Sequence, residues 1–139
     1  MTELIRKLAS EGDLEDREYI DLLEDENREA ELFESALNIK KKYYEDDIYV
    51  RGLIEISSFC RNDCFYCGIR RSNRKAERYR LSRDEILECC DCGYENGFRT
   101  FVLQGGEDLF FTDKLICDIV CTIKERHDDC AVTLSLGEK

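Results

Sequence analysis

The chain has 139 residues, and its 21 basic against 32 acidic side chains give a formal net charge of −11. This excess of acid argues against a broad nucleic-acid-binding surface and a polybasic membrane anchor, and no apolar run approaches the roughly 18 residues of a membrane span. With nine cysteines and no apolar signal segment at the N-terminus, the chain is predicted to be cytoplasmic, where clustered thiols more often serve metal binding or catalysis than disulfides.

Residues 1–45 are predicted to be helical and to carry no chemistry. Gly12 separates the first helix from the second. Apolar side chains recur at helical spacing, with charged residues on the other faces, at Leu4, Ile5, Leu8, Tyr19, Ile20, Leu23, Leu32, Phe33, Ala36, Leu37 and Tyr44. We interpret this segment as an N-terminal helical extension.

A strand is predicted from Ile48 to Ser57, where β-branched residues alternate with others. One face is apolar. The other carries Arg51, Glu55 and Ser57, which suits either the polar interior of a barrel or a solvated face of a sheet.

Two helices and two more strands follow. Ser82 and Glu85 form a capping box at the start of a helix that carries Tyr94 on its apolar stripe and ends at Gly97. The remaining elements are predicted as a strand over 100–104, a helix over 113–126 and a strand over 131–136. This alternation predicts parallel strands joined by right-handed crossovers, in either a doubly wound sheet or a (β/α) barrel. In both folds, functional residues gather at the carboxyl ends of the strands.

A complete (β/α) barrel needs about 250 residues. Residues 46–139 are therefore predicted to form the first three strands and two helices of an incomplete barrel. The open edge of such a sheet predicts that these residues fold poorly and are inactive by themselves.

The strongest chemical signal is the C-x3-C-x2-C motif of Cys60, Cys64 and Cys67, directly after the first strand. Structural zinc sites need four ligands, usually in separated pairs, and no fourth ligand lies nearby in the sequence. Three soft thiolates fit an iron–sulfur cluster that leaves one iron open to a small molecule. Packed or incidental thiols are the alternative, which this spacing disfavours.

This motif, with an aromatic residue just before its last cysteine, resembles the radical S-adenosylmethionine (SAM) superfamily. The resemblance implies an α/β fold, a TIM-type (β/α) barrel, in which Cys60, Cys64 and Cys67 hold a 4Fe–4S cluster. The amino and carboxylate groups of SAM would chelate the fourth iron. Reductive cleavage of SAM would yield a 5′-deoxyadenosyl radical, and Tyr66 would lie near the adenine.

The segment from Gly105 to Asp108 resembles the GGE element of the same superfamily. Gly105 and Gly106 would let the backbone approach SAM closely, and Glu107 would accept hydrogen bonds from its ammonium group. The resemblance assigns further contacts at the strand ends: Gln104 and Thr133 near the substrate or the adenosyl group, and Ser135 and Glu138 at SAM.

Within the superfamily, three stretches between about Lys41 and Glu138 resemble the HydE group of FeFe-hydrogenase maturases: RGLIEISSFCRNDCFYCGIRRSNRKAERYR, FVLQGGED and AVTLSLGE. This resemblance implies a step in assembling the two-iron subcluster of the hydrogenase from a small organometallic iron precursor. Its partners would be other maturation factors and an electron donor such as ferredoxin or flavodoxin. The alternatives are another biotin-synthase-like enzyme, such as methylornithine synthase, or a non-catalytic iron–sulfur protein, which would need a closed set of four thiolates.

Residues 61–80 hold seven basic and two acidic side chains, a local charge of +5 in an acidic chain. Cations here would stabilise a reduced, anionic cluster and an anionic substrate, and would raise the potential of the cluster. A solvated basic loop that pairs with acidic helices is the alternative. A docking site for an acidic electron donor is a third interpretation.

The other six cysteines are predicted to do less chemistry. Cys90, Cys117 and Cys121 lie on or beside apolar helix faces and are expected to pack in the core. Neighbouring residues of a helix point in different directions, so the cysteines between Cys89 and Cys92 cannot converge on one ion. Cys130 receives no role, and His127 is expected to lie on the surface.

Overall fold

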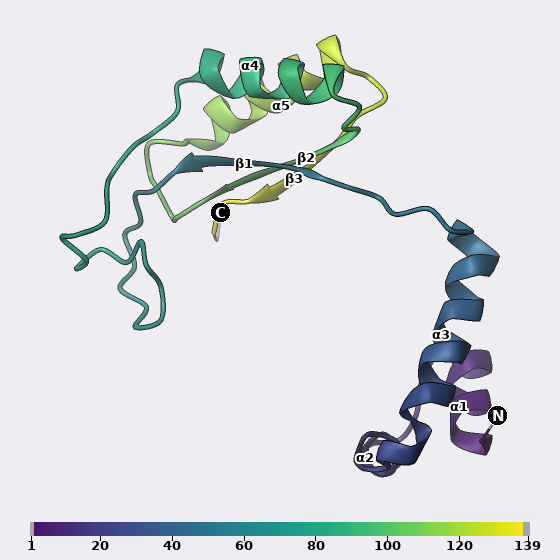
Figure 1. Ribbon diagram of the computed structural model, residues 1–139. Helices are drawn as coiled ribbons and strands as arrows, with labels where there is room; N and C mark the ends of the chain where they lie inside the picture. The colour runs from purple at the N-terminus through teal and green to yellow at the C-terminus, as the bar shows by residue number, and fades with distance from the viewer. Residues whose placement is uncertain (1, 138–139) are drawn as a thin grey trace. The chain divides into compact units, whose positions relative to one another are not determined.

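The computed structural model describes residues 2–137, and the chain divides into two units after Tyr49 (Figure 1). The first unit is helical. The second unit contains all three strands and the two helices that follow the first strand. Within the described range, no helix combines the length and the apolar character needed to cross a membrane.

The helical unit consists of α1 (Glu3–Glu11), α2 (Asp16–Glu24), the short 3-10 helix η1 (Glu26–Arg28) and α3 (Glu29–Tyr44). Gly12 ends α1 with a φ of +78°, a left-handed conformation that glycine adopts without strain. The small core is formed by Ile5, Leu14 and Leu22. None of the 16 residues of α3 is fully buried, and Phe33 on its apolar stripe is 64% exposed.

Strand β1 (Gly52–Ser57) begins four residues later than the sequence predicts. Its hydrogen-bonded register with the next strand starts at Gly52, which is paired with Phe101. Ile48, Tyr49 and Val50 precede this pairing and are all well exposed. Their β-branched pattern did not set the start of the strand, because the start depends on where a neighbouring strand offers hydrogen bonds.

The sheet is parallel throughout, in the order β1-β2-β3, with β2 at Thr100–Gly105 and β3 at Ala131–Ser135. The helices are α4 (Arg83–Glu95) and α5 (Asp113–Arg126), and both lie over the same face of the sheet (Figure 1). A doubly wound sheet carries helices on both faces, whereas a barrel carries them on one. This arrangement is therefore part of a (β/α) barrel.

The core lies between the sheet and the two helices. From the strands it takes Ile54, Ile56, Phe101 and Leu103, and from the helices Ile86, Leu87, Ile116, Ile119 and Ile123. Fully burying one such side chain contributes about 1.5–3 kcal/mol. The helix ends agree with the sequence: Ser82 and Glu85 make a reciprocal capping box on α4, and Thr112 caps α5. Gly97, just past α4, has a φ of +92°.

The opposite face of the sheet is open in the described part of the chain. Leu53, Glu55, Gln104 and Thr133 lie on this face and are exposed. In a barrel this face lines the interior. The sheet thus separates an apolar, helix-covered face from a partly polar one.

Three sequence expectations about packing are wrong. Cys117 and Cys121 are exposed rather than packed in the core, because the fully buried stripe of α5 consists of Ile116, Ile119 and Ile123. His127 is mostly buried, with 13% of its side chain exposed. Its ring stacks on Tyr94 at a centroid distance of 4.1 Å, a contact between two helices that the sequence does not reveal.

Candidate functional site

The three motif cysteines lie in the loop of residues 58–80, which leaves the carboxyl end of β1 (Figure 1). Cys64 is exposed, and Cys60 and Cys67 are partly buried. A turn joins two of them, since the amide of Cys67 donates to the carbonyl of Cys64 at 3.1 Å. The amide of Asn62 points at the sulfur of Cys60, with an N···S distance of 3.4 Å. All nine cysteines of the chain are free thiols.

The donor set of this loop consists of three free thiols. Among residues 2–137, no three His, Cys, Asp or Glu side chains are arranged to hold one metal ion. Three free thiols within one exposed loop are the ligand chemistry that iron–sulfur clusters use. Cys60, Cys64 and Cys67 therefore fit the group that the sequence implies.

The turn after β2 lies directly against the cysteine loop. A Cβ atom added to Gly106 would stand 2.3 Å from the carbonyl oxygen of Phe59 and 2.6 Å from Cβ of Cys60. Both distances are far below van der Waals contact, so only glycine allows this approach. The structure thus brings Cys60 and the Gly105–Glu107 turn together.

Glu107 connects the ends of all three strands. Its backbone carbonyl accepts a hydrogen bond from the amide of Arg61 at 3.0 Å, and its Oε2 lies 2.8 Å from Nε of Arg61. Gly137, after β3, has a φ of +80°, and a Cβ there would lie 2.1 Å from Cγ of Glu107. Glu107 is therefore held between the cysteine loop and the segment that follows β3.

The other predicted ligand contacts are spread along the open face and the loop. Gln104 and Ser135 are register partners on β2 and β3, and both are exposed, as is Thr133. The ring of Tyr66 is 94% exposed, with Phe65 beside it at 98%. Glu138 lies outside the described residues.

A hollow of about 290 Å³ separates the loop from the carboxyl ends of β1 and β2. Glu55 and Gln104 line it from the sheet, and Tyr79 lines it from the loop. Burial, and then the charge of Glu55, raise the pKa of the Tyr79 hydroxyl, so this group stays protonated at neutral pH. The hollow therefore offers both hydrogen-bond donors and acceptors beside the predicted ligand positions.

The basic residues of the loop serve different purposes. The guanidinium of Arg78 donates to four backbone carbonyls of the loop: those of Ser58, Ile69, Arg70 and Asn73. Arg61 pairs with Glu107, and Arg70 donates to the carbonyl of Cys67 at 3.2 Å. Several of the cations therefore fold the loop onto itself rather than pairing with acidic helices. Arg71, Arg74 and Lys75 are exposed.

Sequence reasoning missed Asp108, the residue after the GGE element. Its side chain is 5% exposed and forms an ion pair with Arg80, with Nε 2.6 Å from Oδ2. Burial would raise the pKa of this carboxyl, but hydrogen bonds from Arg80 and Ser57 outweigh burial and hold the pKa below its ordinary value. The partners are 28 and 51 residues away along the chain, so no local pattern could have identified the pair.

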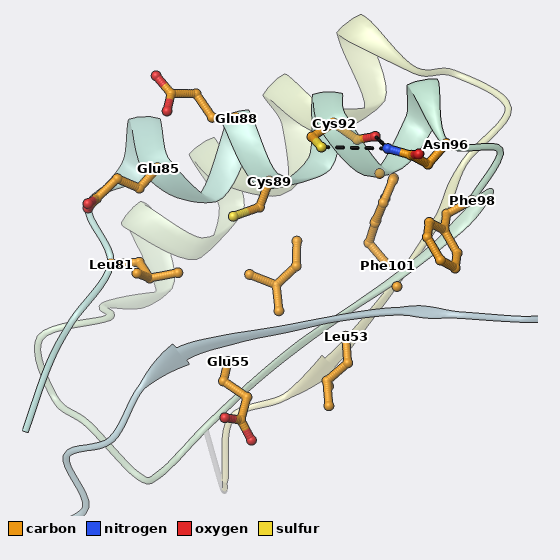
Figure 2. A pocket seen from close by; sticks show the side chains of 13 residues that line it. Leu53, Glu55, Leu81, Glu85, Glu88, Cys89, Cys92, Asn96, Phe98 and Phe101 are labelled. Carbon is orange, nitrogen blue, oxygen red and sulfur yellow. Dashed lines mark hydrogen bonds between the residues drawn. The ribbon is translucent and has the colours of Figure 1, made fainter. Parts of the chain in front are cut away.

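A second hollow lies elsewhere, along β1 and α4, and measures about 680 Å³ (Figure 2). Ile54, Leu81, Phe98 and Phe101 give it an apolar lining, and no predicted site residue lines it. Cys89 and Cys92 of α4 face it, and the amide of Asn96 contacts the sulfur of Cys92 at 3.7 Å. Among the described strands, β1 has β2 as its neighbour, and apart from an isolated bridge between Ser57 and Arg80 its other edge is open beside this groove.

Known proteins resemble most of this chain. No protein-family model matches it. It is 45% identical over 107 residues to the [FeFe] hydrogenase maturase subunit HydE of Thermotoga maritima, covering 77% of this chain and 30% of that protein. It is 32% identical over 92 residues to 3-methylornithine synthase of Methanosarcina acetivorans, covering 66% of this chain and 26% of that protein.

The fold is also similar to a solved structure, that of methylornithine synthase PylB. The TM-score is 0.80 at 26% sequence identity, over 96% of this chain and 40% of that chain. The chain therefore spans less than half the length of each of these proteins. Over that part, the similarity includes both the helices and the parallel strands.

Proposed function

We propose that this chain, which belongs to the radical SAM superfamily, is the cluster- and SAM-binding part of a HydE-type maturase of [FeFe] hydrogenase. The observation that carries the proposal is the 45% identity to HydE, against 32% to 3-methylornithine synthase. We also propose that residues 1–45 are a helical extension and that residues 46–139 are the first three strands and two helices of the barrel.

Cys60, Cys64 and Cys67 would hold a 4Fe–4S cluster, leaving one iron free for SAM. When bound and reduced, such a cluster would supply the electron that splits SAM into methionine and a 5′-deoxyadenosyl radical. The chain itself would set the position of the cluster. The turn between Cys64 and Cys67 and the contact of Gly106 with Cys60 set where the thiols stand relative to the strand ends.

SAM would lie across the ends of the strands. Glu107 offers a carboxylate to an ammonium group, and charge-assisted hydrogen bonds of this kind are among the strongest in proteins. Gly105 and Gly106, whose missing side chains let their turn lie against the cysteine loop, would contact SAM through their backbone. The exposed ring of Tyr66 is free to stack on an adenine. The remaining proposed contacts are Gln104, Thr133, Ser135 and Glu138.

The substrate would be a small organometallic iron precursor, supplied and received by other hydrogenase maturation factors. Its anionic ligands suit a loop with a local charge of +5. Exposed Arg71, Arg74 and Lys75 at this loop also suit an acidic electron donor such as ferredoxin or flavodoxin.

The second candidate is another biotin-synthase-like radical SAM enzyme, with 3-methylornithine synthase favoured by the similarity in both sequence and fold. A non-catalytic iron–sulfur protein would need a fourth protein ligand at the cluster. Beside Cys60, Cys64 and Cys67, the described residues offer no such cysteine or histidine in the loop.

A genetic test separates the two enzymes. Deleting the gene should abolish the activity of the host's [FeFe] hydrogenase, and the protein at its full natural length should restore it. We expect a Cys64→Ala variant to restore nothing and a Cys121→Ala variant, altered at an exposed thiol of α5, to restore full activity. Normal hydrogenase activity after deletion, together with loss of 3-methylornithine from the cell, would favour the second candidate.

A further inference from the structure

Asp108 uses every acceptor position of a buried carboxylate. Its Oδ2 accepts from Oγ of Ser57 at 2.7 Å and from Nε of Arg80 at 2.6 Å. Its Oδ1 accepts from Nη2 of Arg80 at 3.0 Å and from the amide of Phe110 at 3.1 Å. A carboxylate has about four lone-pair sites, so this one is fully satisfied and has one defined orientation.

The guanidinium of Arg80, the partner of Asp108, is also fixed in its orientation by several contacts. Its guanidinium lies 3.9 Å from the ring centroid of Phe59 and 5.2 Å from that of Phe110, and it binds Asp108 in bidentate fashion. A backbone bridge also joins Arg80 to Ser57. The pair therefore ties the last residue of the cysteine loop to the turn after β2 and to the end of β1.

This network ends one residue before the first motif cysteine. Oγ of Ser57 donates to Asp108 and accepts from the amide of Phe59 at 3.1 Å. The carbonyl oxygen of Phe59 is the atom nearest to the place where a Cβ of residue 106 would stand, and Phe59 directly precedes Cys60. Asp108 thus acts on Cys60 from two sides: through Ser57 and Phe59, and through its own turn.

We propose that the Asp108–Arg80 ion pair, together with Ser57, is a positioning device that fixes Cys60 against the Gly105–Glu107 turn before the cluster is assembled. The inference rests on the proposed function, because its purpose is to present one thiol at a set place to the cluster and to SAM. Arg78 holds the later part of the loop through three backbone carbonyls and also donates to the carbonyl of Ser58. The Asp108 network adds the bonds to Ser57 and Phe59, the residues that lead into Cys60.

The test compares two ion pairs in the protein at its full natural length. Asp108→Asn keeps the shape of the side chain but removes the charge and replaces one oxygen, with two of the four acceptor positions, by an NH2 donor. Asp118→Asn is the control for losing an Asp–Arg pair elsewhere, because the exposed Asp118 on α5 pairs with Nε of Arg83 at 2.5 Å, away from the cysteine loop. Ser57→Ala is a milder variant that removes only the hydroxyl joining Asp108 to Phe59.

Three readouts are needed. Hydrogen exchange of the metal-free protein reports the amides of Phe59 and Arg61, which bond to Ser57 and Glu107. The rate of iron loss to a chelator reports how well the cluster is held. Electron paramagnetic resonance (EPR) of the reduced protein, with and without SAM, reports the geometry at the cluster.

We expect Asp108→Asn to speed exchange at both amides, to lose iron about tenfold faster and to change the EPR response to SAM, as loss of a hydrogen-bonded supporting residue typically does at a metal site. Ser57→Ala should show the same changes more weakly. If Asp108→Asn does not fold, the comparison of Ser57→Ala with the wild type replaces it. Asp118→Asn should match the wild type in all three readouts.

Wild-type behaviour of Asp108→Asn and Ser57→Ala in exchange and iron retention would overturn the inference. So would equal changes in Asp118→Asn, because they would show a general loss of stability. If the wild-type protein assembles no cluster, the proposed function fails. The exchange comparison would still decide whether the ion pair holds Cys60 in place.

Discussion

Two groups of three cysteines lie within the second unit of this chain and differ in their backbone setting and in their exposure. Cys60, Cys64 and Cys67 stand on a loop at the carboxyl ends of the strands, all at least partly accessible. Cys89, Cys90 and Cys92 stand on α4, where Cys90 is buried in the core and the other two face an apolar groove (Figure 2).

The difference shows that the backbone beneath the thiols, rather than their number, decides what they can do. A loop can turn three side chains toward one centre, and here the turn between Cys64 and Cys67 begins that arrangement. A helix rotates successive side chains by about 100°, so Cys89 and Cys90 point apart. The first group is suited to ligation, whereas in the second only Cys90 packs in the core and Cys89 and Cys92 are exposed.

The largest expected effect separates the two groups directly. Changing Cys60, Cys64 or Cys67 singly to Ser should abolish the 4Fe–4S cluster, because the cluster depends on each of its three thiolates. Cys89→Ser and Cys92→Ser should retain it. Iron and sulfide analysis after anaerobic reconstitution measures both. Full cluster content in any variant of the first group would show that the altered cysteine is not a cluster ligand.

Thiol labelling should separate members of the second group from one another. Burial, followed by the nearby Cys89 and Asp91, raises the pKa of the Cys90 thiol to about 12, so its thiolate fraction at pH 8 is about a thousandfold below that of an ordinary cysteine. Alkylation at pH 8, followed by mass spectrometry, should modify Cys89 and Cys92 and spare Cys90 in the folded protein.

The control for this labelling is the unfolded protein, in which all nine cysteines should react. Because the pKa of Cys90 is raised in the folded state, the stability that its neutral thiol supports is fully present below its unfolded pKa. That stability is lost as the pH rises toward about 12. Rapid labelling of folded Cys90 at pH 8 would contradict the assignment of this residue to the core.

Two glycines test whether close packing serves the cluster or only the fold. Gly106→Ala places a methyl group 2.3 Å from a backbone oxygen of the cysteine loop, and Gly93→Ala places one 2.7 Å from Cε1 of Phe101 in the core. Overpacking costs about 1–3 kcal/mol, so chemical denaturation should find both variants destabilised. Only Gly106→Ala should also lower cluster content and the affinity for SAM. We expect SAM to bind roughly tenfold more weakly, which corresponds to about 1.4 kcal/mol of binding free energy.

Gly68→Ala is the control within the loop itself, because its added Cβ meets nothing within 4 Å. It should leave cluster content unchanged. A Gly106→Ala protein that loads cluster and binds SAM as the wild type does would show that the contact between Cys60 and the Gly105–Glu107 turn is unimportant for the site.

The smallest effect is expected from exposed charge on the loop. Arg71→Gln combined with Arg74→Gln should slow reduction by an acidic flavodoxin a few-fold at low ionic strength, since surface charges mainly govern the rate of encounter. High salt should remove the difference. Stopped-flow reduction measures it, with Arg17→Gln in the helical unit as control. Equal reduction rates of the variant and the wild type at low salt would show that the loop is not part of the docking surface.

The sequence predicted the elements whose boundaries are set locally. The bounds of α5 agree with the prediction because Ile116, Ile119 and Ile123 mark its buried face, and the capping box at Ser82 marked the start of α4. The similarity to known proteins also agrees with the radical SAM superfamily that the cysteine motif resembled.

What the sequence could not predict depends on contacts between distant segments. The start of β1 follows from its pairing with β2, and the burial of His127 follows from stacking on Tyr94. The role of Asp108 became visible only when the fold brought Arg80 and Ser57 to it. In each case the partner lies too far along the chain for periodicity or a local motif to reveal it.

The central claim is that Cys60, Cys64 and Cys67 hold a 4Fe–4S cluster with one iron open to SAM. The most direct measurement is EPR of the anaerobically reconstituted and reduced protein at its full natural length, before and after adding SAM. We expect the signal of a reduced 4Fe–4S cluster whose g-values shift when SAM is added. No cluster signal, or a spectrum that SAM leaves unchanged, would contradict the account.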